Sequence, residues 1–227
     1  MVSYPANPGS SNQQDQAMNI TLLGAGNMGS ALTSQLTRAG HTVRIVSRNA
    51  DKAQAVAAAN PGASVVPAET AMAGSDTVIV ATGFDDAVPA LKSLGSLAGK
   101  VIVDLTNPLT ADFMGLTIGH DTSVAEEIAK AFPEAEVVKA FNTLFAQVLA
   151  EGASFAHGQI APSFVAADSE RAKATATALI ESIGFQPVDA GPLKNARYLE
   201  PLAGLNIYFG YGAGLGTNVA PSWISRD

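Results

Sequence analysis

The feature that most constrains this chain is a glycine-rich turn between an apolar run and a helix-compatible stretch. The turn reads Gly24-Ala25-Gly26-Asn27-Met28-Gly29, and it lies between residues 18–23 and the rest of the stretch 27–38. In a strand–turn–helix context, the first glycine allows a tight turn and the second lets backbone N–H groups approach a pyrophosphate. The third lets the helix pack close to the strand. The helix N-terminus adds partial positive charge, so the turn predicts a dinucleotide site.

The end of the next apolar run predicts which dinucleotide binds. Residues 41–46 read as a strand that ends at Ser47-Arg48, about 20 residues past the glycines, where an NAD site usually places an acid. A hydroxyl and a guanidinium suit a 2′-phosphate instead, because Arg offers a planar fork of donors. Lys52 adds a second cation, and Asp51 is expected to point away. The sequence therefore favours NADP(H), although Arg48 and Lys52 could also be solvated surface charges.

Strand-like and helix-like segments alternate along the chain, which predicts an α/β fold with a doubly wound, mostly parallel Rossmann sheet and a small C-terminal helical segment. The run 77–81 is apolar throughout, as expected for a strand buried on both faces. The expected strands are 19–23, 42–46, 63–66, 77–81, 100–105, 137–140, 163–166 and 186–190. The expected helices are 27–39, 50–59, 68–73, 85–94, one that starts near Ser123, 169–183 and 193–212.

Three parts are expected along the 227 residues. Residues 1–17 read as a disordered tail, since they hold prolines and a Ser/Asn/Gln stretch but no apolar core of a signal peptide. Residues 18–190 form the NADP-binding domain. Residues 191–227 form a C-terminal helical segment that completes the acceptor pocket and an interface. This last segment is apolar and poor in charge, which predicts a homodimer.

Composition excludes several classes of function. The net charge is −7 and no Lys/Arg-rich run occurs, so no nucleic-acid partner is expected. The chain has no cysteine, and its three histidines show no metal-ligand spacing, so no metal site is expected. No run of about 18 apolar residues occurs, so no membrane span is expected and a cytoplasmic location is the default.

Polar residues follow three of the expected strands, at the sheet edge where ligands bind in open α/β folds. Thr82-Gly83-Phe84, Asn107 and Asn142-Thr143 follow the strands that end near 81, 105 and 140. Thr82, Gly83, Phe84 and Asn107 are expected to bind the nucleotide, with Phe84 beside its ribose or nicotinamide. Asn142 and Thr143 are expected to bind the acceptor. Each Asn could equally serve a turn, and Thr143 a helix cap. No convincing proton donor for carbonyl reduction is found, which favours an acceptor that needs only a hydride, as flavin-like rings do.

Four motifs together are distinctive. They are Gly24–Gly29, Ser47-Arg48 with Lys52, residues 137–143, and Asp189-Ala190-Gly191-Pro192-Leu193 followed by Asn195-Ala196-Arg197. They resemble those of the F420-dependent NADP oxidoreductase family, and the resemblance covers about residues 18–212. The resemblance implies hydride exchange between NADP(H) and coenzyme F420, with no other cofactor. It also implies that Ser47, Arg48 and Lys52 hold the 2′-phosphate and that the acceptor ring lies near Asn142 and Arg197.

One departure from that family leaves the identity of the acceptor undecided. Asn142 stands where the F420-using enzymes tend to carry His, and only Arg197 and Lys194 are cations available for the polyglutamyl phosphate tail of F420. FMN, FAD or riboflavin is therefore an alternative acceptor, and the NADPH–flavin domain of membrane ferric reductases is similar. An imine or β-hydroxyacid type of reductase is a further alternative, but it usually adds a long helical domain. A non-enzymatic NADP(H)-binding regulatory protein is the third.

Overall fold

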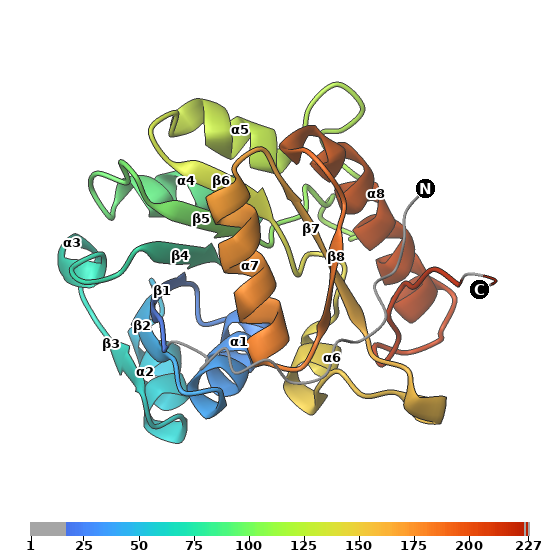
Figure 1. Ribbon diagram of the computed structural model, residues 1–227, viewed down its shortest axis with the longest axis horizontal. Helices are drawn as coiled ribbons and strands as arrows, with labels where there is room; N and C mark the ends of the chain where they lie inside the picture. The colour runs from blue at the N-terminus through green and yellow to red at the C-terminus, as the bar shows by residue number, and fades with distance from the viewer. Residues whose placement is uncertain (1–16, 225, 227) are drawn as a thin grey trace.

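The computed structural model describes residues 17–224 and residue 226. Within these residues, eight strands form one sheet in the order β3-β2-β1-β4-β5-β6-β7-β8 (Figure 1). The chain reverses the order of its strands between β1 and β4, the switch point at which Rossmann folds bind dinucleotides. The strands are β1 Asn19–Leu23, β2 Thr42–Val46, β3 Ala63–Val65, β4 Thr77–Val80, β5 Val101–Asp104, β6 Glu136–Lys139, β7 Pro162–Ala167 and β8 Gln186–Asp189.

Helices cover both faces of the sheet because successive strand side chains point to opposite faces. Leu22 and Ile79 pack with the core beside α1 and α7, whereas the neighbouring Leu23 and Val80 pack with the core beside α4 and α5. Figure 1 shows α7 crossing in front of the sheet and α8 at its right-hand edge. The helices are α1 Asn27–Arg38, α2 Ala50–Ala59, α3 Ala68–Ala71, α4 Phe84–Lys92, α5 Val124–Ala131, α6 Ala146–Glu151, α7 Glu170–Ser182 and α8 Ala196–Ile207.

The predicted doubly wound, mostly parallel fold is confirmed, with most boundaries displaced by one to three residues. β1 to β6 are parallel, whereas β7 is antiparallel to β6 and parallel to β8. α6 is not predicted by the sequence pattern, because its six residues follow a polar turn without a long apolar period. The predicted tail, residues 1–17, lies outside the described residues apart from Ala17.

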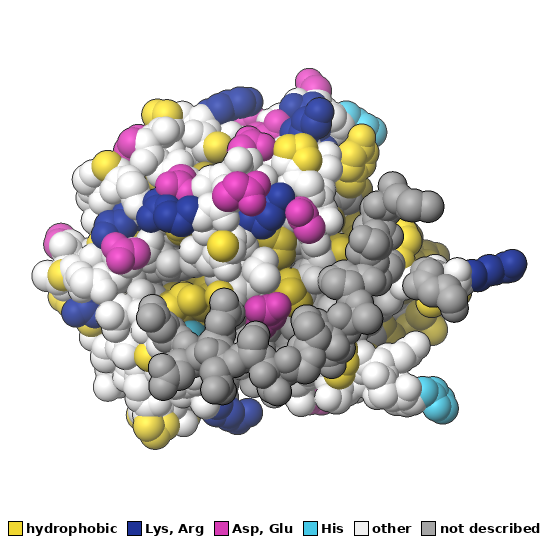
Figure 2. All heavy atoms as spheres, in the orientation of Figure 1, with side chains coloured by type: hydrophobic (Ala, Val, Ile, Leu, Met, Phe, Trp, Pro, Cys, Tyr) yellow, Lys and Arg dark blue, Asp and Glu magenta, His cyan; other side chains and the backbone are white. Residues whose placement is uncertain are grey.

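The C-terminal segment leaves an apolar face in contact with solvent. It consists of a 3₁₀ turn, η2 (Leu193–Asn195), then α8, and then a π-helical turn, η3 (Tyr208–Gly212). Figure 2 shows hydrophobic side chains at the right-hand edge of the molecule, where Figure 1 places α8 and the C-terminal residues. We call this set the C-terminal apolar surface: Leu205, Tyr208, Phe209, Tyr211, Leu215 and Trp223, all exposed.

Among the described residues, no helix is long and apolar enough to cross a membrane.

Candidate functional site

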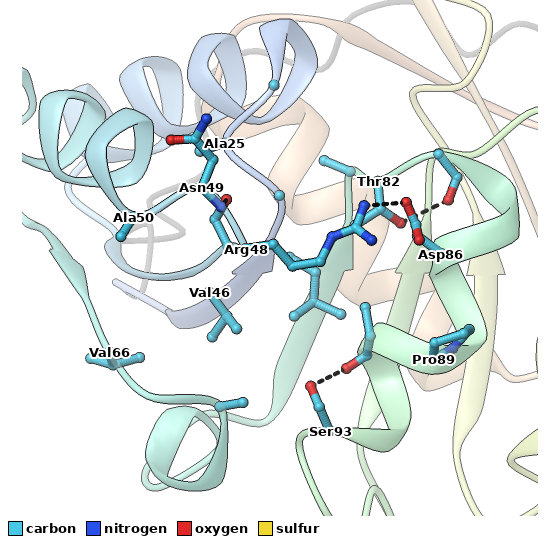
Figure 3. A pocket seen from close by; sticks show the side chains of 18 of the residues that line it. Ala25, Val46, Arg48, Asn49, Ala50, Val66, Thr82, Asp86, Pro89 and Ser93 are labelled. Carbon is cyan, nitrogen blue, oxygen red and sulfur yellow. Dashed lines mark hydrogen bonds and ion pairs between the residues drawn. The ribbon is translucent and has the colours of Figure 1, made fainter.

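A cavity of about 1000 Å³ opens at the carboxyl ends of β1, β2 and β4 (Figure 3). It therefore lies at the switch point of the sheet, where the fold predicts a dinucleotide. The structure brings together seven of the sequence-predicted residues in its lining: Gly24, Ala25, Gly26, Ser47, Arg48, Thr82 and Gly83.

The glycine turn has the geometry that a pyrophosphate site needs. Gly24 has φ +101°, and a Cβ atom there would lie 2.6 Å from the carbonyl oxygen of Ala81. A Cβ atom at Gly29 would lie 2.1 Å from the carbonyl oxygen of Gly24, so this glycine permits the close approach of α1 to the turn. Gly26 caps α1 without a side-chain hydrogen bond, and a Cβ atom there would meet nothing within 4 Å. The cavity therefore leaves open space in front of the first backbone N–H groups of α1, where an anion can bind.

The charged residues at the cavity differ from the predicted arrangement, in which Arg48 and Lys52 face the 2′-phosphate and Asp51 points away. Arg48 Nη2 forms an ion pair with Asp86 Oδ2 of α4 at 2.5 Å. Asp51 lines the cavity, although it was expected to point away, and Lys52 is absent from the lining. The two side chains differ because consecutive residues of a helix are rotated by about 100° around its axis. Asn49 caps α2 by accepting a hydrogen bond from the backbone N–H of Lys52 (2.9 Å).

A second group of predicted residues meets beyond the ends of β5 and β6. Asn107 Nδ2 donates to the backbone oxygen of Asn142, and Asn142 Nδ2 donates to Asn107 Oδ1, each at 2.9 Å. Asn142 Nδ2 also donates to the backbone oxygen of Leu199 in α8 (3.0 Å). The buried atoms Asn142 Oδ1 and Thr143 Oγ1 have no hydrogen-bond partner. Buried polar atoms are rarely left unsatisfied, so these two atoms are candidates for ligand contacts.

Beneath this group lies a buried ion cluster, which we define as Lys139, Asp104 and Glu200. Lys139 Nζ lies 2.7 Å from Asp104 Oδ2, 2.7 Å from Glu200 Oε1 and 2.5 Å from the backbone oxygen of Thr106. The Glu200 carboxylate also accepts from two backbone N–H groups at the start of α5, at 3.1 and 3.4 Å. Burial raises the pKa of Glu200. The cluster joins β5, β6, α5 and α8, and it holds the turn that carries Asn107.

The remaining predicted residues lie outside the cavity lining. Arg197 forms a bidentate pair with Glu126, through Nε at 2.9 Å and Nη2 at 2.7 Å. Arg197 does not pair with Glu200, the acid three residues along α8, because Glu200 is buried against Lys139. Phe84 is half-buried and packs against the core beside α4. Asn27 and Met28 lie in the first turn of α1.

Sequence reasoning misses the buried ion cluster and the role of Asp86. From the sequence alone, Asp104 and Asp86 read as capping or turn residues, and Lys139 reads only as part of a strand. A lysine inside an apolar strand is itself a signal, because a buried cation needs an acidic partner. Which acid it would be could not be read from the sequence, since Asp104 and Glu200 belong to distant elements.

Comparison with known proteins identifies relatives that are named as reductases. A family model described as NADP oxidoreductase, coenzyme F420-dependent, matches residues 19–108. The F420-dependent NADP reductase of Methanothermobacter marburgensis is 30% identical over 208 residues, which cover 84% of this chain and 91% of that protein. Metalloreductase STEAP3 of Rattus norvegicus is 31% identical over 188 residues, which cover 82% of this chain but 36% of that protein. The chain thus spans about a third of the metalloreductase's length.

Solved structures support the same assignment. A protein from Arthrobacter sp. FB24, whose proposed identity is an F420-dependent NADP-reductase, has a TM-score of 0.82 and 30% identity. That match covers 92% of this chain and all of that chain. A reductive aminase from Aspergillus terreus in complex with NADPH has a TM-score of 0.62 and 22% identity over 88% of this chain and 63% of its own, which shows the shared fold alone. The chain therefore belongs to the coenzyme F420-dependent NADP oxidoreductase family.

Proposed function

We propose that this protein is an NADPH-dependent reductase that passes a hydride to coenzyme F420 or to a flavin such as FMN or FAD. The observation that carries the choice of NADPH is Arg48, which lies two residues after the end of β2 and lines the cavity beside Ser47. No acid takes the place at the end of β2 that accepts the ribose hydroxyls in NAD sites. A guanidinium at this place suits the 2′-phosphate.

The cavity lining suits the adenosine and pyrophosphate part of a dinucleotide. The turn Gly24–Gly26 and the first turn of α1 would hold the pyrophosphate, and Ser47 and Arg48 would hold the 2′-phosphate. Thr82 and Gly83, at the N-terminus of α4, would bind the middle of the molecule. The bound nucleotide supplies a hydride, whereas the protein residues bind it, orient it and exclude water. Lys52 lies outside the lining, so we assign it at most a weak, long-range effect.

The acceptor side rests on the polar group after β5 and β6. Asn107 and Asn142 fix each other, and Asn142 Oδ1 and Thr143 Oγ1 remain without partners. The rings of flavins and deazaflavins carry N–H and C=O groups at one edge. Both protein atoms are buried, so such an edge would reach them only after a local rearrangement of this turn. Catalysis then depends mainly on the alignment of two rings.

One observation favours a flavin over F420 as the second candidate acceptor. The tail of F420 needs cations, yet Arg197 is already bidentate with Glu126, which leaves the exposed Lys194 as the other cation. If Arg197 serves the acceptor, it must share its guanidinium with Glu126. An acceptor with a shorter anionic tail requires fewer such contacts.

The test mixes the protein with NADPH and with F420, FMN, FAD or riboflavin in turn, and follows the absorbance of the reduced nicotinamide. Turnover with at least one acceptor supports a reductase, and turnover with none favours an NADP(H)-binding regulatory role. The variant Asn142→His should raise the F420-to-FMN rate ratio if residue 142 sets the acceptor. An unchanged ratio would show that it does not.

We further propose a homodimer formed through the C-terminal apolar surface. Large apolar side chains that are this exposed usually mark an interface with another protein. Tyr211 is 65% exposed and Trp223 61%. A dimeric mass by light scattering at micromolar concentration is expected, and a monomeric mass would contradict the proposal. The charge distribution supports no nucleic-acid partner, and a cytoplasmic location stays a prediction.

A further inference from the structure

The charges of the nucleotide cavity are unusual for a site that receives a polyanion. Among the described residues, three charged side chains line it: Arg48 at the end of β2, Asp51 at the start of α2, and Asp86 in the first turn of α4. Anion sites usually gather positive charge, because a local field of one sign attracts the ligand. Here two carboxylates accompany a single cation, and one of the carboxylates binds that cation directly.

The ion pair spans the cavity. Figure 3 shows the Arg48 side chain extending from the β2 side toward Asp86 on α4, with a dashed line between the two groups. Arg48 is 85% exposed and Asp86 40%, so the pair is solvated and contributes little to folding stability. Its importance lies in where it holds the guanidinium that the proposed function assigns to the 2′-phosphate.

We propose that Asp86 is a specificity-determining residue that competes with the 2′-phosphate of the nucleotide for Arg48. A phosphate offers Arg more negative charge and a bidentate geometry, so it can displace the carboxylate. The displaced Asp86 then lies near the phosphate without its cation, and the repulsion weakens binding. When the nucleotide leaves, Asp86 binds Arg48 again. This inference rests on the proposed function and concerns only nucleotides that carry a 2′-phosphate.

The test compares Asp86→Asn with the control Asp85→Asn. Asp85 belongs to the same helical turn and is exposed, but it does not line the cavity, so the control removes an equal charge from the N-terminus of α4. Calorimetry would measure the Kd of NADP⁺ and of NAD⁺, which differ only by the 2′-phosphate. We expect Asp86→Asn to lower the Kd of NADP⁺ about threefold to tenfold and to leave that of NAD⁺ nearly unchanged. Asp85→Asn should change both by less than about twofold.

A second background tests whether the effect acts through Arg48. When Asp86→Asn is added to Arg48→Gln, the gain in NADP⁺ binding free energy should be less than about half of the gain in the unmodified protein, because the two residues are coupled. An equal gain in both backgrounds would show simple repulsion and overturn the competition. Weaker NADP⁺ binding by Asp86→Asn would also overturn it, since Asp86 would then position Arg48. If the unmodified protein does not prefer NADP⁺ to NAD⁺, the proposed function fails; if it does and Asp86→Asn changes nothing, only this inference fails.

Discussion

The nucleotide cavity leaves its polar groups facing open space, whereas the polar groups beyond β5 and β6 are bonded to one another. At the cavity, a Cβ atom added to Gly26 would meet nothing within 4 Å, and Arg48 holds a solvated carboxylate. Beyond β5 and β6, Asn107 and Asn142 hydrogen-bond to each other, and Lys139 pairs with Asp104 in the buried ion cluster. A ligand can therefore replace the solvated contacts of the first region without breaking the fold, whereas the contacts of the second region are part of the fold.

The strongest test of this contrast removes the cation of the buried ion cluster. Lys139→Met leaves two buried carboxylates without their shared partner, so we expect a loss of about 3–5 kcal/mol in the free energy of unfolding. Urea unfolding measures it. The control Lys130→Met removes a solvated lysine paired with Glu127 and should cost less than about 1 kcal/mol. Equal losses in the two variants would mean that the cluster does not stabilise the fold.

A substitution in the glycine turn should separate binding from folding. Gly26→Val places a side chain in the open space before α1, so the protein should fold but lose measurable NADPH binding by calorimetry. Gly29→Ala places a Cβ atom against the Gly24 carbonyl oxygen, so it should lower the melting temperature instead. Unchanged NADPH affinity of a folded Gly26→Val protein would refute the site.

Arg48 tests the recognition of the 2′-phosphate. Arg48→Ala should raise the KM for NADPH roughly 10- to 100-fold and change that for NADH little, because a charge-assisted contact to the phosphate is lost. Lys52→Ala should have a much smaller effect, since Lys52 does not line the cavity. Equal use of NADPH and NADH by the unmodified protein would contradict the assignment.

The pair between Arg197 and Glu126 should produce the smallest effect, and one that depends on pH. The hydrogen bond from Arg197 lowers the pKa of Glu126 below its ordinary value of 4.5. A lowered pKa in the folded state stabilises the protein above the unfolded pKa, and this contribution is lost as the pH falls through the folded value. The melting temperatures of the unmodified protein and of Glu126→Gln should therefore differ at neutral pH and converge as the pH falls through the lowered pKa of Glu126. A constant difference would show that ionisation of Glu126 is not involved.

Arg197→Ala provides the functional counterpart of that measurement. If Arg197 serves the acceptor, the variant should raise the acceptor KM and leave NADPH binding intact. If the residue serves only the pair with Glu126, the acceptor KM and the affinity for NADPH should stay unchanged, and only the melting temperature should fall.

Local motifs explain why the nucleotide half of the site could be predicted and the other half only in part. The turn Gly24–Gly29 and Ser47-Arg48 act through neighbours in the sequence, so their roles follow from spacing. The same reasoning finds Asn107 and Asn142 as strand-end residues but cannot pair them. Partners such as Asp86 for Arg48 or Glu126 for Arg197 lie 38 and 71 residues away and depend on the packed helices. Asp51 lines the cavity and Lys52 does not, the reverse of the prediction, because the packing of Ala53 and Val56 against the core sets which face of α2 points to the cavity.

The buried ion cluster also bears on the order in which the chain folds. Asp104 and Lys139 are 35 residues apart, and Glu200 is 76 residues from its backbone partner at the start of α5. Closing such long loops costs more chain entropy than the nearer pairing of β1 with β2. We therefore expect α8, which carries Glu200, to dock late and to remove the last water from these charges. Pulse-labelled hydrogen exchange should protect the amides of β1 and β2 before those of Val124 and Ala125.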